Sequence, residues 1–98
     1  MEQNEIQAIR SAVSIKPVRY AAVFGSRARG DSVADSDFDL LIDYRPDYKY
    51  SLLDIVDIKL SLEEKLGRSV DVVTLLSARK KLLQLIDKDL EVIYDAKR

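Results

Sequence analysis

The chain has 98 residues, 47% hydrophobic and 34% charged, with little Gly or Pro; this predicts one globular domain over residues 1–98 and excludes a disordered chain. The net charge of −1 lacks the basic excess typical of nucleic-acid-binding proteins, so we expect no direct nucleic-acid binding. Cysteine and histidine are absent, which excludes disulfides and thiolate zinc sites and leaves Mg²⁺ or Mn²⁺, held by oxygen ligands, as the only plausible metals.

The first half of the chain predicts a helix and two strands. Apolar residues recur at helical spacing over 4–15. Residues 18–24 are rich in β-branched and aromatic side chains and predict a strand. A second strand is predicted over 38–44. The alternation of side chains along that strand places Asp37, Asp39 and Leu41 on one face. Phe38, Leu40 and Ile42 lie on the other face.

A long helix is predicted over 51–66, with Ser51 as its N-cap and Gly67 just past its end. Its apolar residues spread over an arc of roughly 220° at helical geometry. A stripe of a little over about 100° is enough to meet a core. The arc therefore indicates either a deeply buried helix or a helix with one edge that binds another protein. Lys59 and Glu63 interrupt the arc and mark the expected boundary between the core-facing and partner-facing stripes.

The last third of the chain predicts two short strands and a helix. Residues 70–75 form the third strand, in which Asp71 is the one acid that looks buried. Ser77 is expected to cap a helix that runs to about residue 86, and residues 90–94 are expected to form an edge strand. The predicted fold class is α/β (α+β), a small mixed β-sheet flanked by helices.

The most informative motif is a Gly-Ser pair, Gly25-Ser26, followed after ten residues by Asp37-Phe38-Asp39. Gly25 permits a sharp turn and a close approach of phosphate to the backbone. Ser26 then begins a short helix, whose free N–H groups favour anions. Asp37 and Asp39 project from one face of a strand and can bridge a pair of divalent ions. The motif therefore predicts a site for a nucleoside triphosphate with divalent metal.

Further residues extend this predicted site. Asp71 on a later strand supplies a third carboxylate, which would hold metal and help deprotonate an acceptor hydroxyl. Arg27 and Arg29 place positive charge near the phosphates, and Ser36 orients the neighbouring carboxylates. Each feature alone has a commoner explanation, because a lone Asp-x-Asp is usually solvated surface and a lone Gly-Ser is usually a turn. Their conjunction at correctly spaced strand ends favours the functional interpretation.

The segment from Phe24 to Asp43 resembles the signature of the DNA polymerase beta-type nucleotidyltransferase superfamily. The short chain further resembles the minimal nucleotidyltransferases, the antitoxin partners of HEPN-domain ribonuclease toxins. The resemblance implies metal binding at Asp37, Asp39 and Asp71, and triphosphate binding at Gly25 and Ser26. It also implies Mg²⁺-dependent transfer of AMP from ATP to a tyrosine of a HEPN toxin, which neutralises the toxin.

Two other functions stay open at this point. The chain could modify a small molecule such as an aminoglycoside, with a further domain or a second copy completing the pocket. It could also block its partner sterically, without catalysis.

No apolar run approaches the about 20 residues of a membrane span, and no signal peptide is visible, so we expect a cytoplasmic protein.

Overall fold

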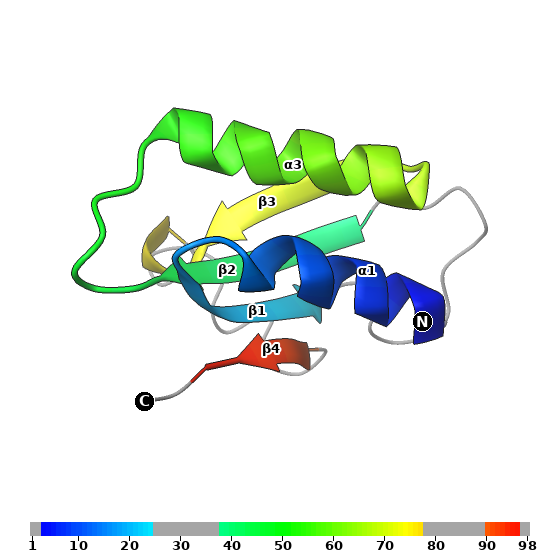
Figure 1. The fold of residues 1–98 in the computed structure, drawn as a ribbon, viewed down its shortest axis with the longest axis horizontal. Helices are drawn as coiled ribbons and strands as arrows, with labels where there is room; N and C mark the ends of the chain where they lie inside the picture. Colours follow the sequence, from blue (N-terminus) through cyan, green and yellow to red (C-terminus); the bar gives the residue numbers. More distant parts are fainter. Residues whose placement is uncertain (1–2, 25–37, 78–89, 97–98) are drawn as a thin grey trace.

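The computed structural model describes residues 3–24, 38–77 and 90–96 (Figure 1). Two predicted strands have the predicted bounds, and the two long helices and the remaining strands begin and end within one or two residues of prediction. The elements are α1 (Gln3–Ser14), β1 (Val18–Phe24), β2 (Phe38–Tyr44), α3 (Leu52–Leu66), β3 (Val70–Thr74) and β4 (Glu91–Asp95).

The strands form one mixed sheet in the order β3-β2-β1-β4. β1 pairs antiparallel with β2 and with β4, whereas β2 and β3 run parallel. A parallel pair needs a crossover connection, and α3 supplies it between β2 and β3. The predicted small mixed sheet flanked by helices is therefore confirmed, and β4 is an edge strand as expected.

Both long helices pack on the same face of the sheet and form the core with it. α1 contributes Ile9 and Val13, and α3 contributes Ile58 and Leu62, all of which are buried. The sheet residues that meet them alternate along the strands, as the pleat requires. They include Phe38, Leu40 and Ile42 of β2 and Val70 of β3, whereas in β1 a register shift between Val18 and Tyr20 brings Val18 into the same core as Val23. On the opposite face, Leu41 is buried among a smaller apolar group that includes Phe24 and Val73.

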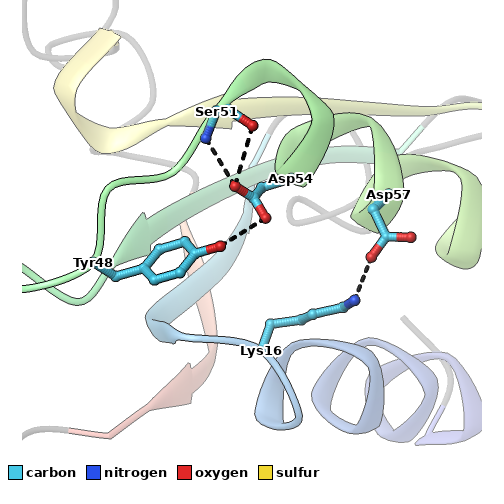
Figure 2. Close-up of polar contacts among 5 residues, drawn as sticks. All are labelled: Lys16, Tyr48, Ser51, Asp54 and Asp57. Carbon is cyan, nitrogen blue, oxygen red and sulfur yellow. Dashed lines mark hydrogen bonds and ion pairs between the residues drawn. The ribbon is translucent and has the colours of Figure 1, made fainter.

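Polar contacts fix the start of α3 (Figure 2). The Asp54 carboxylate accepts a hydrogen bond of 2.8 Å from the Ser51 N–H and one of 2.9 Å from the Tyr48 hydroxyl. The Ser51 N–H and the Tyr48 hydroxyl together hold the pKa of Asp54 below its usual value, and the same bond raises the pKa of Tyr48. Lys16, just after α1, pairs with Asp57 and links the two helices. Ser51 is therefore the N-cap of α3, as predicted.

The exposed side of α3 carries an apolar stripe, formed by Leu52, Leu53, Val56 and Leu60. Leu53 is 79% exposed and Leu60 58%, whereas Ile58 and Leu62 on the core side are each 1% exposed. The wide apolar arc is thus divided between core and solvent. None of the helices in the described ranges is long and apolar enough to cross a membrane.

The helix after β3 begins earlier than predicted. Leu75, Leu76 and Ser77 are already helical, so the strand ends at Thr74 instead of Leu75. The Thr74 hydroxyl accepts a 3.3 Å hydrogen bond from the Ser77 N–H, which makes Thr74 the N-cap that we had assigned to Ser77. The rest of that predicted helix lies outside the described residues.

Candidate active site

Three strand ends meet at one end of the sheet, and they are the ends that the sequence motif flanks. Phe24, the last residue of β1, pairs with Asp39 near the start of β2. Asp39 in turn pairs with Asp71 near the start of β3. β1 therefore ends beside the two strand residues that carry these carboxylates. The other predicted site residues, Gly25, Ser26, Arg27, Arg29, Ser36 and Asp37, lie outside the described residues.

Asp39 and Asp71 share one face of the sheet. They are direct partners in the parallel β2–β3 ladder, and neighbouring strands lie about 4.8 Å apart. Phe38, Leu40 and Val70, which alternate with them, belong to the core beneath α1 and α3. The two carboxylates consequently lie on the face that these helices leave uncovered.

The burial of the two carboxylates differs, and it corrects one prediction. Asp39, in the second strand from the edge, is half-buried, whereas Asp71 is exposed. Asp71 had looked like a buried acid because apolar residues surround it in the sequence. Its strand lies at the edge of the sheet, and its side chain points away from the helices. An exposed position suits a group that must meet a metal ion or an acceptor.

The pair fits the chemistry of a hard divalent cation. Carboxylate oxygens are the donors that Mg²⁺ and Mn²⁺ prefer, and two of them on adjacent strands can share one ion or bridge two. No group of three potential ligands occurs within residues 3–24, 38–77 and 90–96; the predicted third member, Asp37, lies outside these ranges.

Asp43, a further acid on the same face of β2, does not belong to this site. It follows Asp39 by four residues, which is about 13 Å along a strand. Its carboxylate accepts a 2.7 Å hydrogen bond from the Arg19 guanidinium, with which it forms an ion pair. Asp43 therefore pairs with Arg19 at the other end of the sheet, and Asp71 is the acid that lies next to Asp39.

The contacts that Lys59 and Glu63 make with β3, close to the site, were not predicted from the sequence. Lys59 donates to Glu63 at 2.7 Å and to the Val70 carbonyl at 2.8 Å, while the Val70 N–H donates to Glu63 at 3.0 Å. The Lys59 and Val70 bonds hold the pKa of Glu63 below its usual value. The pair lies between the buried and exposed stripes of α3, where it binds β3; that the exposed stripe faces a partner stays a prediction. The spacing of Lys and Glu by four residues was the only signal in the sequence.

Comparison with known proteins places this arrangement in a family. The family described as polymerase beta, nucleotidyltransferase matches residues 4–98. The protein adenylyltransferase MntA of Thermococcus cleftensis is 36% identical over 77 residues, which are 79% of this chain and 74% of that protein. A protein from Methanocaldococcus jannaschii, provisionally named a protein adenylyltransferase, is 41% identical over 75 residues, covering 76% of this chain and 78% of its own.

A solved structure shows the same fold. It is a complex of a tri-AMPylated HEPN toxin from Shewanella oneidensis with an MNT antitoxin. One of its chains superimposes with a TM-score of 0.75 at 18% identity, over 97% of this chain and 73% of that one. The family resemblance drawn from the segment between Phe24 and Asp43 is confirmed. The chain belongs to the polymerase beta nucleotidyltransferase family.

Proposed function

We propose that this protein is an antitoxin that transfers AMP from ATP to a tyrosine hydroxyl of a HEPN ribonuclease toxin and thereby neutralises it. The observation that carries the proposal is the direct pairing of Asp39 with Asp71, next to the end of β1 from which Gly25 follows. The names of the two relatives support protein adenylylation as the activity. The HEPN toxin in the related complex carries AMP groups, which supports the class of acceptor.

The roles of the site residues follow from their chemistry. Asp37, Asp39 and Asp71 would hold Mg²⁺ or Mn²⁺, which when bound stabilises the negative charge that develops on the phosphate oxygens. Gly25 and Ser26 would bind the triphosphate through backbone N–H groups and the serine hydroxyl. Arg27 and Arg29 would add positive charge beside the phosphates, and Ser36 would orient the carboxylates.

The reaction exchanges one phosphorus–oxygen bond for another. The acceptor hydroxyl oxygen attacks the α-phosphorus of ATP, and the bond from that phosphorus to the bridging oxygen breaks, so that pyrophosphate leaves with the electron pair. The hydroxyl proton passes to the Asp71 carboxylate, which is exposed and therefore accessible to an incoming side chain.

The sheet restricts the direction from which the acceptor can arrive. Asp39 and Asp71 lie on the face opposite α1 and α3, at the end of the sheet where β2 and β3 begin. Leu52 and Leu53 lie at the start of α3, where the chain has just come from the other end of β2 (Figure 1). The tyrosine must therefore approach from the side of the sheet opposite α1 and α3, and contacts to the exposed stripe of α3 alone would not present it to the site.

The proposal is tested with the co-purified toxin, ATP and Mg²⁺, by measuring the intact mass of the toxin. The toxin mass should increase by whole AMP units, and Asp39→Asn should remove the increase because it removes the charge that holds the ions. Asp43→Asn is the matched control, since Asp43 is on the same strand and face but pairs with Arg19. An unmodified toxin, or full transfer by Asp39→Asn, would contradict the proposal.

A further inference from the structure

Lys59 and Glu63 of α3 hold both backbone polar groups of Val70, the residue directly before Asp71. The Lys59 ammonium reaches the Val70 carbonyl at 2.8 Å, and the Glu63 carboxylate accepts the Val70 N–H at 3.0 Å. The two side chains are joined to each other at 2.7 Å. One Glu63 oxygen, Oε2, accepts both the ammonium and the backbone N–H, so the contacts close a ring.

The ring occupies the outer edge of the sheet. Among the strands that the structure describes, β3 pairs with β2 alone, and the Ser69 carbonyl accepts a 3.0 Å hydrogen bond from the Phe38 N–H. Backbone groups of successive residues point to opposite sides of a strand, so those of Val70 point away from β2. Without the ring, Val70 would keep its buried side chain in the core, but its outward backbone N–H and carbonyl would lose these two partners at the edge of the sheet.

We propose that the Lys59–Glu63 pair is a positioning device for Asp71, which sets the place of the Asp71 carboxylate relative to that of Asp39. The inference rests on the proposed function, because it assumes that Asp71 acts in the transfer. Lys59 and Glu63 touch neither substrate nor metal in this account. They act through the backbone of Val70.

Small displacements at this point have large consequences. β3 comprises the five residues Val70–Thr74, and Asp71 is the second of them, so a shift at Val70 is passed on to Asp71 almost undiminished. Oxygen ligands must lie within about 0.2 Å of their ideal distances for a divalent ion. A displacement of about 1 Å in a reacting group costs on the order of 100-fold in rate. A partial loosening of β3 should therefore reduce turnover by about 10-fold.

The test compares Lys59→Met with the control Lys65→Met, because Lys65 is an exposed lysine in the last turn of the same helix. Toxin modification is measured at several ATP and Mg²⁺ concentrations, well below the melting temperature of each variant. For Lys59→Met we expect kcat to fall about 10-fold while the KM for ATP stays within about twofold. Lys59→Arg, which keeps a charged donor, should recover most of the rate.

A second readout needs no turnover. Titration with Mn²⁺ alone, followed by the rise in melting temperature, reports metal binding to the free protein. The Mn²⁺ concentration for half of the maximal rise should increase severalfold in Lys59→Met and stay unchanged in Lys65→Met. A merely stabilising role for Lys59 would lower the melting temperature but leave that half-maximal concentration in place, and this result would overturn the inference.

Coupling to Asp71 separates this inference from the proposed function. If Lys59 acts through Asp71, the double variant Lys59→Met/Asp71→Asn should be no slower than Asp71→Asn alone. Additive losses, with Asp71→Asn itself strongly impaired, would overturn the positioning role and leave the proposed function intact. Full activity of Asp71→Asn would overturn the assignment of Asp71 and the inference with it.

Discussion

Replacement of Asp71 by Asn should stabilise the metal-free protein while it removes the transfer activity. Asp39 and Asp71 are direct partners in a parallel ladder, and like charges placed opposite each other destabilise a sheet. Asn preserves the shape of the side chain and removes one of the two charges. The two neighbouring carboxylates would then lower the stability of the protein while they maintain its transfer activity.

The structure gives the size of the effect. Strand spacing places the two charges about 5 Å apart, and at the dielectric constant of water they repel by about 0.8 kcal/mol. The water-like value applies because Asp71 is exposed. In a domain of this length 1 kcal/mol moves the melting temperature by about 4–8 °C, so Asp71→Asn should melt about 3–6 °C higher at low ionic strength. Salt of about 0.1 M should remove roughly half of that gain, because the Debye length is then about 10 Å.

The assay is thermal melting in buffer treated with a chelator, followed by melting with added Mg²⁺. Mg²⁺ should raise the melting temperature of the wild type more than that of Asp71→Asn, because the variant lacks one of the charged ligands. Asp43→Asn is again the control, and it should not gain stability since it loses the Arg19 contact. If Asp71→Asn melts at or below the wild type without metal, the repulsion argument is refuted.

The other predictions concern stability and pH. Gly67→Ala should cost about 1 kcal/mol in a melt, because Gly67 has φ +69° with open space around an added Cβ, so the penalty is conformational only; Gly67→Asn should cost less. Glu63 has a lowered pKa, so its contribution is present above its ordinary pKa of 4.5 and is lost as the pH falls; Glu63→Gln should flatten this part of the acid melting profile. Burial first and the Asp54 charge second raise the pKa of Tyr44 to about 12, so stability should decline as the pH rises from 10 to about 12. Alkaline melts of Tyr44→Phe should show a smaller decline, because Tyr48 also has a raised pKa.

Local sequence was sufficient for most elements of this fold. The strands that flank the motif were predicted with correct bounds. The strand-forming residues of β1 end directly before Gly25, and those of β2 begin at Phe38. The ends of α3 were correct because Ser51 and Gly67 carry their own signals, a capping position and a left-handed conformation. The start of the helix after β3 was wrong because Thr74 and Ser77 are both good caps, and pattern alone does not choose between them.

The candidate site could be predicted as a set of residue types, but its geometry could not. The face shared by Asp39 and Leu41 follows from alternation along one strand. The register that sets Asp39 opposite Asp71 depends on how α3 returns the chain to the sheet, and no local pattern specifies it. The burial of Asp71 was wrong for the same reason. Alternation separates two faces without saying which one the helices cover.

The order of the strands has a consequence for shortened forms of the chain. β1 is flanked by β2, which follows it closely, and by β4, which comes from residues 91–95. Removal of those residues would uncover the backbone of Ala21, Ala22 and Val23, whose partners are Tyr94, Val92 and Glu91. An apolar strand with an open edge is a template for pairing between molecules. A version cut before residue 91 should therefore aggregate even where its helices and the paired carboxylates are intact.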